Sequence, residues 1–159
     1  MMAKIISAFP CCGKSYFVNH NTKYHCIELD SSIYSWMVIN GTKIRNPDFP
    51  ENYIEQIKTH LFSFDVIFIS SHVSVRTALR YSKLPYILVY PNNTPECFEE
   101  WKRRAYSRGS MALWDTVLGP CWTHFLHSCK GDTGASIHYR LQSDEYIDAV
   151  VRMEVGDVD

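Results

Sequence analysis

The sequence lacks the long apolar run that a membrane-spanning helix needs. No stretch approaches the roughly 20 consecutive apolar residues that cross a bilayer. Residues 5–9, the apolar run nearest the start, are too short for the core of a secretory signal. We therefore expect a cytoplasmic protein with no membrane partner.

The chain also lacks a Cys-x-x-Cys pair, internal repeats and low-complexity segments. Its six cysteines are Cys11, Cys12, Cys26, Cys97, Cys121 and Cys129. Without a signal peptide, reduced thiols are the expected state. Cys121, His124, His127 and Cys129 are residue types that bind zinc, but their spacing is not a usual zinc pattern, and an ordinary helix explains them equally.

An excess of charge of one sign is missing too. Lys and Arg number 16 against 17 Asp and Glu, a net charge of −1. No global field draws such a chain to nucleic acid or membranes, so any anion site must be local. The 159 residues are 46% apolar and 14% aromatic, enough for one domain with a buried core. We expect a single domain over residues 1–159.

Apolar runs and helical periodicities alternate along the chain. Strands are predicted at residues 4–8, 25–29, 65–70, 85–90 and 136–141. Helices are predicted at residues 13–20, from Pro50 onward, at 73–82 and at 96–107, with a last one capped by Ser143 that buries Tyr146, Ile147, Val150 and Val151. Asn40-Gly41 marks a turn, residues 110–128 are ambiguous, and residues 156–159 form a frayed tail.

This alternation predicts an α/β protein: a three-layer fold, like that of the P-loop NTPases, with a mostly parallel central sheet of about five strands. The unbroken apolar run in DVIFIS favours a strand that is buried on both faces. Ligands of such sheets bind beyond the carboxyl ends of the strands. That rule selects residues 9–15, 30–32, 70–76 and 91–94.

Residues 8–15, AFPCCGKS, match the phosphate-loop motif GxxxxGK[ST] except at the first glycine. In this motif backbone N–H groups surround the phosphates, the lysine reaches the β- and γ-phosphates, and the hydroxyl ligates Mg²⁺. Lys14 and Ser15 are the residues expected in these two roles, against the alternative of a chance Gly-Lys-Ser turn. The remaining loop residues expected around the nucleotide are Pro10, Cys11, Cys12, Gly13 and Tyr16.

Two loop positions depart from the motif. Ala8 replaces a glycine, which is tolerable if its φ is negative, and Cys11 stands where related loops often carry glycine, which predicts a strained backbone. Cys11 and Cys12 are interpreted as small packing residues, the alternative being a redox or metal switch. A thiol such as Cys11 at the start of a helix is open to acidification and alkylation.

Acidic candidates for magnesium are few. Asp30 follows the second strand, where it is suited to hold Mg²⁺ or accept a proton from an attacking hydroxyl; a helix cap is the alternative. The acid usual after the apolar strand is replaced by Ser70, Ser71 and His72. The magnesium partner of Ser15 is therefore expected to be Asp30 or Ser70.

Cations follow the third and fourth strands. Arg76, with Ser71 and His72, is a candidate for gripping the acceptor substrate. A second group is expected to face the phosphates and neutralise the transferring group, unless it is only a solvated helix surface. Its members are Lys102, Arg103, Arg104 and Arg108.

The chain resembles a P-loop kinase of the nucleoside and nucleotide kinase superfamily, and more narrowly small P-loop proteins encoded by bacteriophages. AFPCCGKS, LDSS, FDVIFISSHVSVR, YP, EEWKRRAYSRG and YIDAVV carry the resemblance. It implies a parallel sheet, ATP with Mg²⁺ as phosphoryl donor, a lid around residues 95–130 with Arg104 and Arg108 as its arginines, and the host cytoplasm as location. By the same resemblance Asp30 is a base or metal-organising residue.

The leading hypothesis is an ATP-dependent phosphotransferase that acts on a nucleoside, a nucleotide or a modified base, with Lys14, Asp30, Arg104 and Arg108 as catalytic residues. Residues 33–53, including Tyr34, Ser35 and Trp36, are expected to build the acceptor pocket. A non-catalytic protein that binds or sequesters nucleotides is the first alternative. A nucleic-acid kinase is the second, and the net charge of −1 does not favour it.

Overall fold

The computed structural model describes residues 1–156, so most of the tail predicted to fray, residues 157–159, lies outside the described part. Five strands form one sheet in the order β2-β5-β1-β6-β7, and every neighbouring pair is parallel. These strands are β1 (Lys4–Ala8), β2 (Cys26–Glu28), β5 (Val66–Ser70), β6 (Ile87–Pro91) and β7 (Ile137–Leu141). The predicted α/β class and five-stranded parallel sheet are confirmed, with strand ends shifted by one or two residues.

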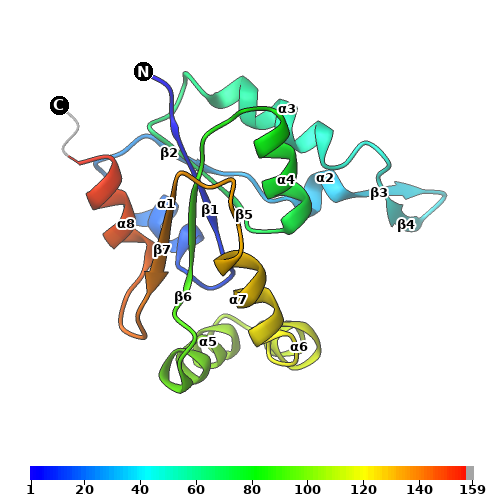
Figure 1. The fold of residues 1–159 in the computed structure, drawn as a ribbon. Helices are drawn as coiled ribbons and strands as arrows, with labels where there is room; N and C mark the ends of the chain where they lie inside the picture. Colours follow the sequence, from blue (N-terminus) through cyan, green and yellow to red (C-terminus); the bar gives the residue numbers. More distant parts are fainter. Residues whose placement is uncertain (157–159) are drawn as a thin grey trace.

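Helices flank the sheet on both faces (Figure 1). One face carries α1 (Lys14–His20) and α8 (Ile147–Glu154). The other carries α3 (Glu51–His60), α4 (Val73–Tyr81) and α7 (Trp122–Lys130). The chain leaves β1 toward the first face, whereas it leaves the neighbouring strands β5 and β6 toward the second. The connections therefore diverge beyond the carboxyl end of β1, which is the usual place for a ligand crevice. Within residues 1–156 no helix is long and apolar enough to cross a bilayer.

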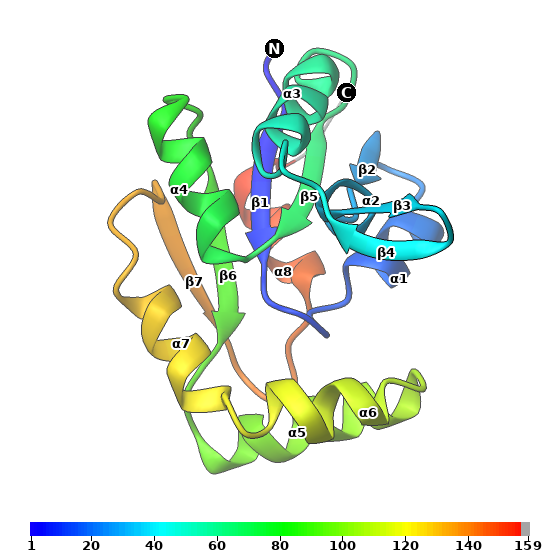
Figure 2. The ribbon, with the colours of Figure 1, turned by 90° about the vertical axis from the view of Figure 1, so that its right-hand side faces the viewer.

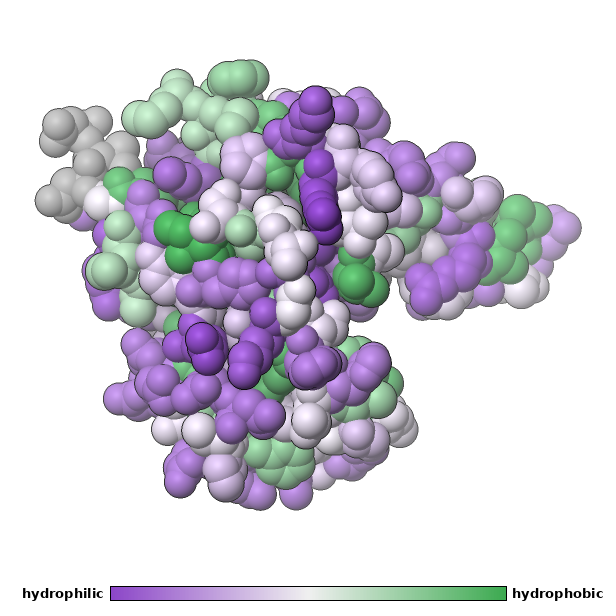
Figure 3. Space-filling model, in the orientation of Figure 1, coloured by the Kyte–Doolittle hydropathy of each residue, from purple (hydrophilic) through white to green (hydrophobic). Residues whose placement is uncertain are grey.

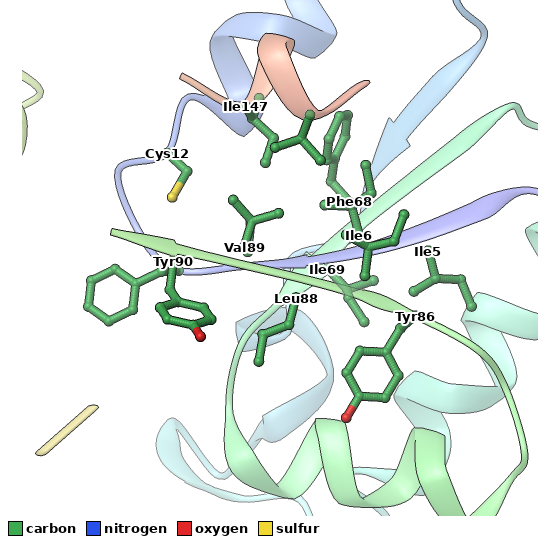
Figure 4. Packing of buried hydrophobic residues seen from close by; sticks show 14 of the residues in the cluster. Ile5, Ile6, Cys12, Phe68, Ile69, Tyr86, Leu88, Val89, Tyr90 and Ile147 are labelled. Atoms are coloured by element: carbon green, nitrogen blue, oxygen red, sulfur yellow. The ribbon is translucent and has the colours of Figure 1, made fainter. Parts of the chain in front are cut away.

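The core is built on the three central strands. Ile6, Phe68 and Val89 face α8 with Cys12 and Ile147, while Leu88 and Tyr86 lie on the opposite face (Figure 4). The four apolar residues of β5 are fully buried, as expected for a strand covered on both faces. This packing fixes β1, and with it the start of the loop that follows.

A two-stranded excursion follows β2. After α2 (Ser32–Ser35), strands β3 (Trp36–Ile39) and β4 (Thr42–Arg45) form an antiparallel hairpin that projects from the body (Figure 1). Asn40 and Gly41 have φ of 52° and 77°, the pair of positive values that a tight hairpin turn requires. The turn was predicted, but its strands were missed. Apolar side chains, drawn in green, lie near the tip of the hairpin (Figure 3).

The segment between β6 and β7 runs beneath the carboxyl ends of the strands (Figure 2). It holds α5 (Pro95–Ser107), the short α6 (Met111–Leu113), the π-helix η1 (Trp114–Leu118) and α7. Edge-to-face contacts of Phe98 with Trp114 and Trp122, and of Trp122 with Phe9, join this segment to the body. The region proposed as a lid therefore has an anchored base.

The last helix differs from its prediction. It begins after Tyr146, which occupies the N-cap position in place of Ser143. Ile147, Val150 and Val151 are buried as expected, but Tyr146 is 42% exposed. The prediction that Tyr146 is buried is wrong, because the chain turns there and directs the ring toward Gly13 and not into the core.

Candidate functional site

A cleft of about 710 Å³ lies beyond the carboxyl ends of β1, β2 and β5. Its floor is the loop after β1, and its other walls come from the end of β2, from α5 and α6, and from Tyr146. Of the sequence-predicted site residues it brings together Pro10, Cys11, Gly13, Lys14, Ser15, Tyr16, Asp30, Arg104 and Arg108. Cys12, Ser71, His72 and Arg76 do not line it.

The loop has the backbone shape that an anion-binding nest needs. Cys11 and Gly13 have φ of 65° and 95°, both in the left-handed region, so successive peptide groups turn to the same side. The strained position predicted at Cys11 is confirmed. Ala8 lies within β1 and is not among the residues of positive φ, so its methyl group is accommodated.

The carbonyl groups of the loop are bound by neighbouring helices. Trp101 Nε1 donates to the Pro10 carbonyl at 3.0 Å. Arg104 donates to the Cys11 carbonyl at 3.1 Å, and the N–H of Ile147 donates to the Cys12 carbonyl at 2.8 Å. With α5 and α8 holding these oxygens, the loop keeps its shape without a ligand.

The amides of the same loop are free. The backbone N–H groups of residues 11–16 find no acceptor in the part of the chain that the structure describes. Backbone N–H groups are obligatory hydrogen-bond donors, so such a run needs water or a ligand as partner. The convergence of free donors at the cleft suits an anion with several oxygens.

Lys14 adds a cation to this nest. Its Nζ donates to the Ala8 carbonyl at 2.9 Å, so the side chain folds back across the loop. Burial lowers the pKa of Lys14, against the opposing effect of Cys12 and Glu28. An ammonium group held in this way is short of compensating charge, and an anion in the cleft would supply it.

Ser15 has an acidic partner that sequence reasoning missed. Its hydroxyl donates to Glu28 Oε1 at 2.8 Å, and Glu28 is the last residue of β2. Both groups are hard oxygen donors of the kind Mg²⁺ takes, together with phosphate oxygens and water. They could therefore hold that ion at the edge of the nest.

Asp30 and Ser70, the expected partners of Ser15, line the same cleft. Asp30 is exposed, and its Oδ1 accepts the N–H of Ser32, the first residue of α2, at 2.9 Å. The N-cap position of α2 belongs to Ser31, so the helix-cap alternative for Asp30 is not borne out. Ser70 Oγ is buried without a hydrogen-bond partner among residues 1–156. This orphaned hydroxyl is a further polar group available to a ligand.

Arg104 and Arg108, on α5 and at its C-terminal end, differ in how far their side chains are buried and held by hydrogen bonds. Arg104 is buried, stacks between Trp101 and Tyr146, and donates to the carbonyls of Ser143 and Glu145 as well as to Cys11. Its role here is to clamp the loop. Arg108 is exposed, and among the described residues its guanidinium donates hydrogen bonds only to Ser110 Oγ and Cys11 Sγ, so it can turn toward an anion in the cleft.

The residues after β5 lie elsewhere. Arg76 is buried on α4, where it pairs with Asp132 at 2.8 Å and donates to Ser71 and Ser128. These contacts place its guanidinium in the packing between α4 and α7 and leave it no part in the cleft. Desolvation and the cations Lys14, Arg45 and Arg76 lower the pKa of His72.

The loop cysteines are packing residues, as interpreted. Cys11 and Cys12 are 7% and 1% exposed, and all six cysteines are free thiols. Burial raises the pKa of Cys12 to about 12. Burial also raises the pKa of Cys11, although Arg108 and Lys14 oppose it, so the expected acidification of this thiol is wrong.

Residues 1–156 contain no group of three or more His, Cys, Asp and Glu side chains placed to share a metal ion. Cys121, His124, His127 and Cys129 therefore do not form such a group. Comparison with models of known protein families and with curated proteins finds no match to the chain. The functional argument therefore depends on the geometry of the cleft.

Proposed function

We propose that the protein binds ATP with Mg²⁺ and transfers its γ-phosphoryl group to a hydroxyl of a nucleoside, a nucleotide or a modified base. The observation that carries this is the run of free backbone amides from Cys11 to Tyr16. The same run holds the Lys14 ammonium group and the Ser15 hydroxyl, which is bonded to Glu28. Free donors, a buried ammonium and adjacent hard oxygens match a polyphosphate and its cation.

Each group has a role in this proposal. The loop amides and Lys14 hold the β- and γ-phosphates, and Ser15 with Glu28 would hold Mg²⁺, which supplies neutralisation of charge on those phosphates. Arg108 approaches the transferring group from α5. Arg104 acts through the loop that it clamps, which changes the role first expected for it.

Asp30 is the candidate base. Its Oδ1 is tied to Ser32, and Oδ2 has no donor among the described residues, so it can accept the proton of an acceptor hydroxyl. The acceptor oxygen forms a bond to the γ-phosphorus, the bond from that phosphorus to the β–γ bridging oxygen breaks, ADP leaves, and the proton passes to Asp30. Most of the acceleration comes from positioning and charge.

The test combines calorimetry with a transfer assay. Wild type is expected to bind MgATP, and Lys14→Ala to lose at least about tenfold in affinity and all transfer while keeping its unfolding midpoint. Lys58→Ala, an exposed lysine of α3 in a weak pair with Glu55, is the matched control and should behave as wild type. Unchanged turnover by Lys14→Ala would contradict the proposal.

A non-catalytic nucleotide-binding role is the second candidate, because Ser70 stands where an acid would follow the apolar strand. Tight MgATP binding without transfer to any nucleoside, nucleotide or oligonucleotide acceptor, and without hydrolysis, would favour it. Transfer to oligonucleotides alone would identify a nucleic-acid kinase.

A further inference from the structure

The ring of Tyr16 lines the cleft outside the core and outside the groups proposed to hold the phosphates. Tyr16 directly follows Ser15 in the first turn of α1, and 70% of its surface is exposed. Single exposed aromatic residues are common on protein surfaces and need no explanation of their own. Tyr16 differs in lining the same cleft as Lys14 and in having a fixed orientation.

The orientation comes from His20, one helical turn further on. The two rings stack with centroids 3.9 Å apart and planes 16° from parallel. The imidazole Nδ1 lies 2.8 Å from the Tyr16 carbonyl, which holds the histidine in place. Because one face of the phenol ring is packed and the residue is still largely exposed, the other face remains open. A ring fixed in this way loses little rotamer freedom when a ligand covers it.

The surroundings give the cleft two chemically distinct parts. Around Lys14 and Arg108 it presents free amides and cations. Around Tyr16 it presents an aromatic ring, and Leu113 of α6, 39% exposed, lines the cleft as well. A ligand with phosphates at one end and a flat ring at the other matches both parts.

We propose that the stacked pair Tyr16–His20 is the platform for the base of the bound nucleotide, with Leu113 covering that base from α6. This rests on the function proposed above and adds the means of base recognition. Every nucleobase has a π-face, so an aromatic platform selects ring area and not a hydrogen-bond pattern. ATP and GTP are therefore expected to bind alike, and both more tightly than CTP and UTP.

The experiment compares two ligands that share phosphates but differ in the base. Affinities of MgATP and of magnesium tripolyphosphate are measured by calorimetry on wild type, Tyr16→Leu and Tyr16→Phe. Tyr16→Leu is expected to weaken MgATP roughly 5- to 100-fold and tripolyphosphate less than about twofold, while Tyr16→Phe keeps both affinities. Tyr81→Leu is the matched control, because Tyr81 of α4 is also largely exposed, at 83%, and does not line the cleft.

The outcomes separate the two proposals. If wild type binds MgATP no more tightly than tripolyphosphate, or if Tyr16→Leu leaves MgATP affinity unchanged, the base platform is wrong and the phosphate site stands. An equal loss for both ligands in Tyr16→Leu also overturns the platform, because Tyr16 would then act only through the loop. If wild type binds neither ligand, both proposals fall.

Discussion

Cys11 and Gly13 make the turns that direct the loop amides toward the cleft. A left-handed backbone is cheap for glycine and costs a residue such as Cys11 roughly 1–2 kcal/mol. Gly13 is further constrained, because a Cβ there would lie 3.1 Å from Tyr146 Cδ1. The bonds from Trp101, Arg104 and Ile147 to the neighbouring carbonyls offset the strain and keep it in the loop.

The lowered pKa of Lys14 predicts a pH dependence of binding. Lys14 must be charged to hold phosphate, and burial makes it lose its proton at a lower pH than an ordinary lysine. MgATP affinity should therefore fall as pH rises into the alkaline range, by up to about tenfold per unit above the pKa of the empty protein. Calorimetry between pH 7 and 10 measures it.

Lys14→Arg is the control for this prediction. A guanidinium stays charged throughout the range, so any affinity that the variant retains should not fall with pH. A parallel decline in both proteins would assign the pH dependence to another group.

At the scale of elements, α5 connects the loop to the segment beneath the sheet. Its buried side chains Trp101 and Arg104 hold the loop, while Arg108 lies at its exposed end. One helix thus supplies both a fixed support and a movable cation. The aromatic packing of Phe98, Trp114 and Trp122 holds this segment against the body, including the residue that directly follows α6.

Adjacent arginines of α5 should differ sharply in their effect on stability. Arg104→Ala leaves the carbonyls of Cys11, Ser143 and Glu145 without their donor and should lower the free energy of unfolding by about 2–4 kcal/mol. Arg103→Ala breaks a pair with Glu100 and an interaction with Tyr146 at an exposed side chain, and it should cost much less than that. Urea unfolding of both variants measures this, and similar losses would contradict the clamp.

At the scale of the whole molecule, a buried ion pair joins α4 to the turn after α7 on the second face of the sheet. Asp132, after α7, accepts from Arg76 of α4, from Tyr86 and from the N–H groups of Gly134 and Ala135. The carboxylate is thereby satisfied although it is only 7% exposed. Arg76 serves this junction, which explains why an arginine close in sequence to the predicted site is remote from the cleft.

The junction predicts a loss of stability in acid. Burial raises the pKa of Asp132, but hydrogen bonds from Arg76, Ala135 and Tyr86 outweigh it and lower the pKa below its ordinary value. A carboxyl with a lowered folded-state pKa stabilises the protein above its unfolded pKa, and that contribution is lost as pH falls through the folded one.

Asp132→Asn tests this junction. The variant should be less stable than wild type by about 3–5 kcal/mol at pH 7, because Arg76 loses its counterion. The difference should begin to shrink below about pH 4, where the carboxyl of the unfolded chain takes up its proton, and should go on shrinking as pH falls through the lower folded-state pKa. Urea unfolding at several pH values measures it, and a difference that does not vary with pH would contradict the assignment.

The sequence by itself determined the features that depend on neighbouring residues. The order of strands and helices follows from apolar runs and periodicity, which are local patterns. The loop of residues 8–15 is contiguous, so the tolerated Ala8 and the strained Cys11 were both predictable. Asn40-Gly41 is a strong hairpin signal as well, and the missed strands β3 and β4 could have been inferred from it.

Only the tertiary structure decided which side chains meet. Glu28 reaches Ser15 because β2 ends beside the start of α1. That proximity depends on the strand order, in which the chain passes from β1 through α1 to β2 on the far side of β5. Arg104 and Arg108 differ by one helical turn in sequence, yet packing buries the first and leaves the second exposed. Tyr146 looked like a core residue and instead lies in the cleft. Periodicity states which residues share a face, while burial and partners depend on what packs against that face.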